Sequence, residues 1–597
     1  MKKTPNLKDH KKKSVEKILK HNSFSLQIKR FQKKIGLLQE YCQKEGIFAE
    51  VGKAKLPCPH GVFISLGNPD TRAVVLHAAG ETPEMAWEAA VAKTLAYLEK
   101  SSFEVCYVKA DFVDQAERAP LEKVNNFASK CRKKFFRRGL AFDGALQYAF
   151  LEAELNAVPL LRYGEENPGV ALEKVNTYLE KNNMPPMESL PGEVLAFQCQ
   201  GVFCDLDDRI YPLYHRGLEY GRRKIDAFTK EIVDETVTSA AAQLSNMLQK
   251  NGEFQYGFRA HTAKPLSGYN MVRHIAVLWA LLMEYSRSRE KKLKEKIDMA
   301  LQYALKNAIE EINGLPYVIE HKTGEIKLGA NAVAVITLAH YMEVTGDRSY
   351  EELACRLGES ILSFADEGGD GYWHILSYPD GTKKEKYRIV YYDGEAALAL
   401  TKLYGVTKEE KWLRAAQSFV DYFIEQDYTK YCDHWVGYSL NELTKYIPEE
   451  KYFAFSLKNI ENNRIKLYRG EITTPTWMEL LVSSFETYHR MKTLYPALAA
   501  QQGFDEKRFI TMVYYRGQRM LDSYLYPEYA MYFKKPKPFL GSFAVRYDNF
   551  RVRIDDIQHF IGGFYHLLMD FEILEGYRKA FGIEPKEYLW LQEKYMK

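Results

Sequence analysis

Polar and aromatic residues recur at the start of one apolar, helix-like segment after another in the C-terminal two-thirds of this chain. The clusters occupy residues 269–274, 329–331, 391–395, 432–435, 473–477 and 553–559. Each precedes a run rich in small and apolar residues, and a second helix with one apolar face separates it from the next cluster. This alternation is typical of helical hairpins arranged in a ring, whose inner helices present their first residues to one shared cavity.

The domain organisation follows from where that pattern begins. A chain of 597 residues is too long for one ordinary core. Residues 1–22 are lysine-rich and are expected to form a basic flexible tail. Residues 23–224 mix strand-like and helix-like segments, including a helix over 83–98 with Thr82 as N-cap, and predict a small α/β domain. Residues 225–597 carry roughly twelve helical segments and predict an (α/α)6 toroid. The predicted fold class is therefore α+β and multidomain.

Composition and charge argue against several functional classes. The chain is 46% hydrophobic and 27% charged, with a formal net charge of only +4. Its overall electrostatic field therefore does not favour the binding of nucleic acid. No apolar run is long enough to span a membrane, and the start of the chain lacks the apolar stretch of a secretory signal. The eight cysteines contain no CxxC pair, which favours a reducing, cytoplasmic setting. No phosphate- or dinucleotide-binding motif appears, so no cofactor is expected, and the oligomeric state stays open.

Two segments carry a resemblance to a known superfamily. Residues 341–350 (YMEVTGDRSY) and 392–400 (YDGEAALAL) resemble the hairpin joints and inner-helix starts of the six-hairpin (α/α) toroid superfamily. That superfamily includes many glycoside hydrolases, N-acylglucosamine 2-epimerase-type isomerases and, more loosely, glucuronyl C5-epimerases. The resemblance covers about residues 225–575. It implies a funnel-shaped site lined by the inner-helix N-termini and a small-molecule or oligosaccharide substrate.

Carboxylates at two of the helix starts suggest glycoside hydrolysis. Asp393 and Asp556 each lie where an inner helix is expected to begin. Hydrolysis of a glycosidic bond needs two carboxyl groups that divide the acid and base roles. The first-choice function is therefore a glycoside hydrolase in which Asp393 and Asp556 act as this pair. The structural alternative is that each aspartate caps its own helix.

Histidines at three helix starts support a different chemistry. His274, His434 and His559 each lie in one of the clusters, and an imidazole can transfer protons near neutral pH. Epimerases of the superfamily that the chain resembles use paired histidines. A sugar epimerase or isomerase is therefore the alternative function, with His274 and His559 among the predicted catalytic residues. A non-catalytic toroid that binds glycans or proteins is a third possibility.

The remaining polar and aromatic residues of the clusters are predicted to bind substrate. A guanidinium fork suits an anionic or polar group, and flat aromatic rings suit stacking on sugars. The predicted binding residues are Tyr269, Arg273, Tyr392, His434, Trp435, Trp477, Arg553 and Gln558. No metal is expected, because the adjacent side chains of Cys432, Asp433 and His434 cannot all converge from one helical face.

Overall fold

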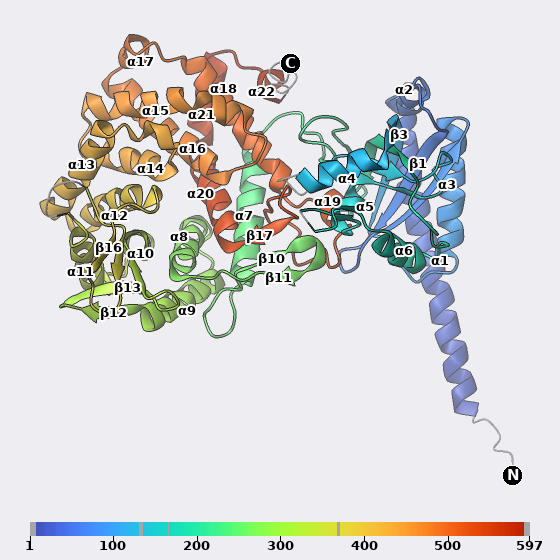
Figure 1. The fold of residues 1–597 in the computed structure, drawn as a ribbon, viewed down its shortest axis with the longest axis horizontal. Coiled ribbons are helices and arrows are strands. Elements are labelled where there is room, and N and C mark those ends of the chain that lie inside the picture. Colours follow the sequence, from blue (N-terminus) through green and yellow to red (C-terminus); the bar gives the residue numbers. More distant parts are fainter. Residues whose placement is uncertain (1–6, 131–134, 165, 367–370, 590–597) are drawn as a thin grey trace.

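The computed structural model describes residues 7–130, 135–164, 166–366 and 371–589 (Figure 1). It has two lobes, one built around a sheet and one almost wholly helical, as Figure 1 shows. Within the described ranges, no helix combines the length and apolar character needed to cross a membrane.

The N-terminal lobe is built on an antiparallel sheet. Its strands run in the order β2 (Val74–Gly80), β1 (His60–Gly67), β3 (Tyr107–Pro120), β8 (Glu193–Cys204), β4 (Gly139–Ala141) and β5 (Ala149–Phe150), and β9 (Ile210–Pro212) pairs with β8. Every pairing is antiparallel, which is not the parallel arrangement that an α/β domain usually has.

Helices α1 (Leu7–Lys44) and α3 (Pro83–Leu98) pack against one face of this sheet. Their buried side chains, among them Phe31 and Trp87, share a core with Phe112 of β3. The Thr82 hydroxyl accepts a hydrogen bond from the Met85 amide at 3.2 Å, as expected for the predicted N-cap. Helix α1 begins within the stretch predicted as a flexible tail, of which residues 1–6 lie outside the described part.

Shorter elements complete this lobe. They are α2 (Ile47–Gly52), α4 (Leu121–Lys130), α5 (Glu152–Ala157), α6 (Leu172–Lys181) and the two-stranded sheet of β6 (Leu161–Arg162) and β7 (Gly169–Val170). The side chains of α4 and α6 pack with those of β4, β5 and β8 in a separate core.

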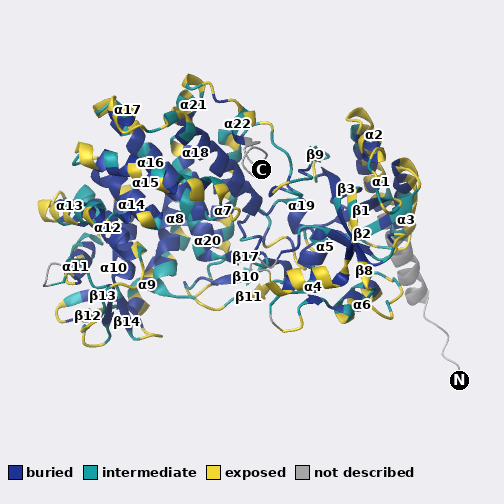
Figure 2. Cartoon of the chain, turned by 45° about the horizontal axis from the view of Figure 1, so that its top comes forward, coloured by how far each residue is buried: buried dark blue, intermediate teal, exposed yellow. Residues whose placement is uncertain are grey.

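The helical lobe contains a closed ring of helices. Its members are α8 (Met271–Ser288), α10 (Leu328–Thr345), α12 (Tyr391–Thr407), α14 (His434–Leu443), α16 (Pro475–Leu494) and α20 (Ile554–Met569). Each contacts the next in this order, and α20 contacts α8, so the ring closes. These helices are buried over most of their length (Figure 2), because neighbours cover them on several sides. The small and apolar runs noted in the sequence therefore form the inner ring.

A second set of helices packs against the ring from outside. These helices are α7 (Lys230–Asn246), α9 (Lys291–Ala308), α11 (Glu351–Leu362), α13 (Glu410–Glu425), α15 (Glu450–Arg469) and α18 (Glu506–Met520). They alternate along the chain with the ring helices, so the structure has a helix in each range where the sequence predicts one. The peripheral helices are α17 (Leu498–Gln501), α19 (Pro527–Ala530), α21 (Phe571–Ala580), α22 (Pro585–Leu589), η1 (Ala260–Thr262), η2 (Tyr428–Tyr431) and η3 (Leu521–Ser523).

Short strands lie in the connections that precede ring helices. One sheet has the order β11 (Lys264–Pro265), β10 (Gly257–Arg259), β17 (Arg551–Arg553), and the other runs β12 (Ile309–Ile312), β13 (Leu315–Glu320), β14 (Glu325–Lys327), β15 (Ile375–Ser377), β16 (Lys383–Glu385). The helix expected over 290–312 ends at Ala308, since the next four residues pair with β13 as β12. Their two isoleucines suit a strand better than a helix.

The segment between α18 and α20 joins the two lobes. The Ala73 amide donates to the Met531 carbonyl at 2.7 Å, and the Ser65 and Tyr532 hydroxyls are 2.9 Å apart. A buried ion pair of 3.2 Å links Arg546 to Glu152 of the N-terminal lobe. The same segment ends in β17, directly before α20, and so connects the N-terminal lobe to one end of the ring.

Candidate active site

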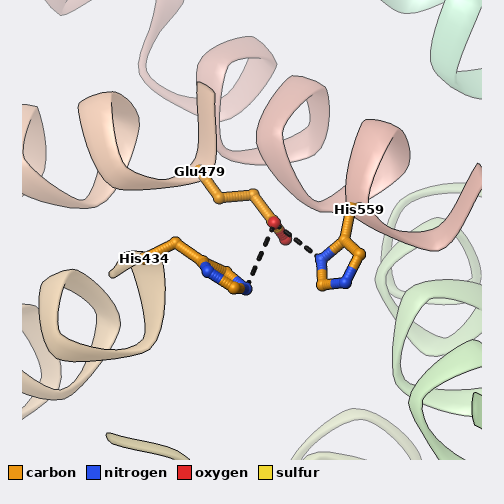
Figure 3. Close-up of side chains that lie close together, drawn as sticks. All are labelled: His434, Glu479 and His559. Atoms are coloured by element: carbon orange, nitrogen blue, oxygen red, sulfur yellow. Dashed lines mark hydrogen bonds and ion pairs between the residues drawn. The ribbon is translucent and has the colours of Figure 1, made fainter. Parts of the chain in front are cut away.

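Three ionisable side chains from different ring helices converge near the starts of those helices. Figure 3 shows His434 of α14, Glu479 of α16 and His559 of α20 pointing toward one another. Glu479 Oε2 accepts a hydrogen bond from His559 Nδ1 at 2.7 Å and lies 3.6 Å from His434 Nε2. The two imidazole rings are 5.1 Å apart, centre to centre, and nearly perpendicular. One potential ligand atom from each of the three residues lies within 4.8 Å of the others, so the set could also hold a metal ion.

Local sequence explains how these helices approach so closely. Asp433 caps α14 by accepting from the Trp435 amide at 2.9 Å, which fixes His434 as the first helical residue. A Cβ atom at Gly562 of α20 would lie only 2.5 Å from Glu479 Oε1. Glycine at 562 therefore leaves room for the carboxylate between α16 and α20.

The two imidazoles experience opposite electrostatic environments. His434 is fully buried, and neither of its ring nitrogens has a hydrogen-bond partner among the described residues. Burial, followed by the nearby charge of His559, lowers the pKa of His434 well below its ordinary value. Burial also acts to lower the pKa of His559, but the charge and hydrogen bond of Glu479 outweigh it and raise that pKa. The pair therefore combines a neutral imidazole with one that favours the proton.

Two further buried carboxyl groups interact with each other, and one of them, Asp433, directly precedes His434 in the sequence. The Oε2 atom of Glu395 and the Oδ2 atom of Asp433 are buried and have no hydrogen-bond partner in the described part of the chain. Burial, and then the charge of the other carboxyl, raises the pKa of Glu395 well above its ordinary value. Burial likewise raises the pKa of Asp433, with further contributions from Asp393 and Glu479. Both groups thus favour the neutral acid, which can donate a hydrogen bond.

The aspartates predicted to act as an acid/base pair already have strong partners. Asp556 accepts from Arg553 Nη2 at 2.7 Å and from Arg553 Nε at 2.9 Å, and Arg551 Nε lies 3.2 Å away. Asp393 accepts from His374 Nε2 at 3.1 Å and from Tyr428 at 2.6 Å. Bidentate and buried pairs of this kind hold the carboxylate in place. These contacts favour a structural role for both aspartates.

Of the other predicted residues, His274 and Tyr269 lie together, apart from the histidine pair. The Tyr269 hydroxyl lies 2.6 Å from His274 Nδ1, and His274 Nε2 lies 2.8 Å from the Ala300 carbonyl of α9. His274 therefore points toward an outer helix. Burial lowers its pKa to about 4, as is typical of a hydrogen-bonded core histidine.

The predicted substrate-binding residues are divided between the rim and the core. Arg273 Nε is 3.1 Å from Asp555 Oδ2, and both side chains are partly exposed at the end of the ring near β17. Trp435 is buried and stacks on Trp279, with ring centres 5.6 Å apart. Trp477 is partly exposed, with the Arg516 guanidinium 4.6 Å from its ring centre.

Tyr392 and Gln558 complete the predicted set, and both are buried. The Tyr392 ring packs near His374, with ring centres 5.4 Å apart. The side-chain oxygen and nitrogen of Gln558 are buried without a hydrogen-bond partner among the described residues. An unsatisfied buried amide next to His559 in the sequence makes Gln558 a continuing candidate for substrate contact.

Sequence reasoning missed Glu479 as a site residue. It is the only charged residue in the run Trp477-Met478-Glu479-Leu480-Leu481-Val482, so its position in an apolar helix was a usable signal. Glu395 and Asp433 lay inside the recognised clusters but were not assigned a role. Their raised pKa values depend on burial and on the neighbouring carboxyl groups, which only the folded chain reveals.

Comparisons with known proteins give structural neighbours only. No protein-family model matches the sequence, and no curated protein sequence does. A cellobiose 2-epimerase from Spirochaeta thermophila has 12% identity and a TM-score of 0.45, over 58% of this chain and 97% of that one. A cellobiose 2-epimerase from Bacillus thermoamylovorans has 14% identity and a TM-score of 0.42, over 50% and 88%. A GH76A α-1,6-mannanase from Salegentibacter has 14% identity and a TM-score of 0.41, over 56% and 99%. Each of these likenesses, at 12–14% identity, concerns the fold alone.

Proposed function

We propose that this chain is a carbohydrate-active enzyme of the six-hairpin type that epimerises or isomerises a sugar by proton transfer. The observation that carries the proposal is the pair His434 and His559, whose rings lie 5.1 Å apart with the Glu479 carboxylate between them. This was the alternative function predicted from the sequence. It takes precedence here because the histidines converge from separate ring helices, whereas Asp393 and Asp556 are held by other partners.

The chemistry needs one base and one acid on a carbon next to a carbonyl group. In an open-chain sugar the base removes the proton from C2, and the electron pair forms an enediolate with the C1 aldehyde. Return of a proton to the opposite face of C2 gives the epimer, and return to C1 gives the ketose. Proton gain and loss balance, and no other reactant is consumed.

The contacts of the two histidines suggest which is the acid and which is the base. The hydrogen bond between His559 Nδ1 and Glu479 stabilises a protonated imidazole, so His559 is the proposed acid. His434 has no such bond in the described chain and is the proposed base. Glu479 also accepts from the Tyr438 hydroxyl at 3.2 Å, which helps to fix the carboxylate. We assign Glu479 a positioning role, because it acts through His559.

The test is proton NMR of the purified chain in D₂O with reducing mono- and disaccharides. The expected result is loss of the C2–H signal by exchange and appearance of the epimer or ketose. His434→Asn and His559→Asn should each abolish exchange. The control is His566→Asn, since His566 makes the same 2.7 Å contact to a glutamate two turns further along α20. New reducing-end signals without C2 exchange would instead establish a glycoside hydrolase and overturn the proposal.

A further inference from the structure

The geometry of His434, Glu479 and His559 leads to a second proposal. We propose that these three side chains bind one divalent transition-metal ion, with Zn²⁺ as the best-suited ion, and that the bound metal blocks proton transfer. Metal binding is independent of the proposed function, whereas the inhibition rests on it.

The donor set suits a transition metal. Two imidazole nitrogens and one carboxylate oxygen are ligands that zinc, cobalt and copper accept. One such atom from each residue lies within 4.8 Å of the other two, from three different ring helices. Tetrahedral bonds of about 2.0–2.2 Å bring ligand atoms to about 3.5 Å from one another. His434 Nε2 and Glu479 Oε2 are already 3.6 Å apart, so only small side-chain rotations are needed.

The surrounding residues match what a metal-binding histidine requires. His434 Nδ1 lies 3.5 Å from Asp433 Oδ1, so a hydrogen on Nδ1 would face a carboxyl oxygen and leave the Nε2 lone pair for the metal. The Tyr438 hydroxyl donates to the other oxygen of Glu479. The buried ring nitrogens of His434 have no hydrogen-bond partner in the described chain, which costs free energy. A bond from one of them to a metal ion would offset part of that cost.

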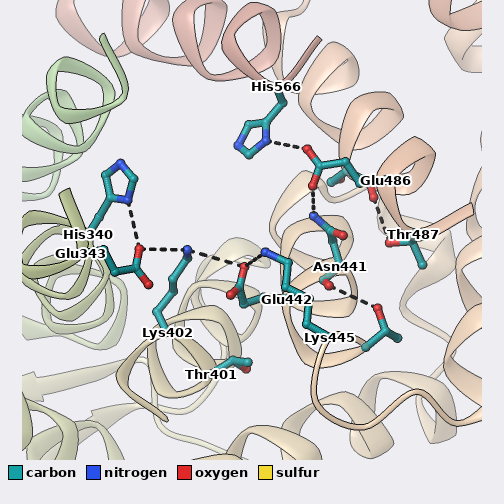
Figure 4. A network of polar contacts seen from close by, with 12 residues as sticks. His340, Glu343, Thr401, Lys402, Asn441, Glu442, Lys445, Glu486, Thr487 and His566 are labelled. Atoms are coloured by element: carbon teal, nitrogen blue, oxygen red, sulfur yellow. Dashed lines mark hydrogen bonds and ion pairs between the residues drawn. The ribbon is translucent and has the colours of Figure 1, made fainter. Parts of the chain in front are cut away.

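The chain contains a natural comparison seven residues further along each helix. Figure 4 shows Glu486 of α16 in contact with both Asn441 of α14 and His566 of α20. The His566–Glu486 distance is 2.7 Å, equal to the His559–Glu479 distance. Asn441 takes the place of His434, so the second set offers one imidazole and one carboxylate where the first offers two imidazoles and one carboxylate. The difference between the two sets is therefore the second imidazole.

A metal at the first set would compete with the proposed reaction. Coordination through His434 Nε2 removes the lone pair that the base needs, and coordination through His559 Nδ1 displaces the hydrogen that Glu479 holds there. The ion would also neutralise the Glu479 charge. Zn²⁺ should therefore inhibit sugar epimerisation, and a chelator should restore it.

The binding test uses the full chain after treatment with EDTA and dialysis. Co²⁺ is titrated into the protein while its visible d–d absorption is recorded. Zn²⁺ binding is measured by calorimetry and by its displacement of bound Co²⁺. The expected result is one ion per chain, with affinity at least 100-fold lower in His434→Asn and about 10-fold lower in Asp433→Asn. His566→Asn and Glu486→Gln should bind as the natural chain does. Circular dichroism of each variant shows whether it is folded.

Several outcomes would overturn the proposal. Absence of stoichiometric Co²⁺ binding, or binding that His434→Asn leaves unchanged in a folded chain, rejects the site. A metal-loaded chain that exchanges C2–H as fast as the EDTA-treated chain rejects the inhibition alone. If no sugar shows exchange under any condition, the proposed function fails, whereas the Co²⁺ spectra still decide the metal site.

Discussion

Replacing Glu479 by glutamine tests whether the His559–Glu479 pair is built for catalysis. The carboxylate is fully buried and accepts from His559 Nδ1 at 2.7 Å and from Tyr438 at 3.2 Å. A hydrogen bond to a charged group contributes about 1.5–3 kcal/mol and a neutral one about 0.5–1.5 kcal/mol. Glutamine keeps the shape but loses the charge, so Glu479→Gln should lower the free energy of unfolding by about 1–2 kcal/mol.

A double-mutant cycle with His559→Asn isolates this interaction. Because both residues share one bond, the double variant should be more stable than the sum of the single effects predicts, by about 1–2 kcal/mol in urea unfolding. In the same preparations, C2 exchange by Glu479→Gln should fall by about 10²–10⁴-fold, the range for loss of a positioned acid. The matched cycle of Glu486→Gln and His566→Asn should show coupling without loss of exchange. The reasoning would be refuted if the losses of unfolding free energy at Glu479 and His559 were additive. It would also be refuted if Glu486→Gln lost C2 exchange as strongly as Glu479→Gln.

Three further predictions concern stability. Burial raises the pKa of Glu154 to about 7. The folded state therefore holds a proton that the unfolded state releases near pH 4.5, and stability falls as pH rises from about 4.5 to 7. The Glu154→Gln variant lacks this pH-dependent loss of stability. The difference in free energy of unfolding between the variant and the natural chain, measured in urea, should therefore shift in the variant's favour by about 3 kcal/mol from pH 4 to pH 8. A Cβ at Gly394 would lie 2.7 Å from Trp435 Cβ. Gly394→Ala should therefore lower the free energy of unfolding by about 1–3 kcal/mol, seen as a lower melting temperature. Arg546→Met leaves Glu152 buried without the arginine of its ion pair. The free energy of unfolding should fall by about 3–5 kcal/mol, and the segment joining the lobes should be cleaved faster by a protease.

The helical architecture was predictable because it depends on local patterns. Small and apolar runs mark the ring helices, and their alternation with amphipathic helices gave the correct order of inner and outer elements. Thr82 and Pro83 correctly marked the start of α3. The antiparallel pairing of β3 with β8 was harder to predict from the sequence, since these strands are separated by some 70 residues with several elements between them. Only tertiary contacts select that partner.

The site was predictable in part, for the same reason. His434 and His559 could be selected as polar residues at helix starts, but which histidines meet depends on how the ring closes. His274 looks equivalent in the sequence, yet its ring turns toward Ala300 of an outer helix. Asp393 looked available, but its partners His374 and Tyr428 lie 19 and 35 residues away in the sequence. Contacts of this kind, which form only in the folded chain, decide whether a carboxylate is free to react.

The most direct test of the account is the rate of C2–H exchange in D₂O for the natural chain, His434→Asn and the His566→Asn control, all in EDTA-treated form. We predict exchange with at least one reducing sugar, a loss of about 10²–10⁴-fold in His434→Asn and no change in His566→Asn. Exchange that persists unchanged in His434→Asn would contradict the central claim that this histidine removes the proton.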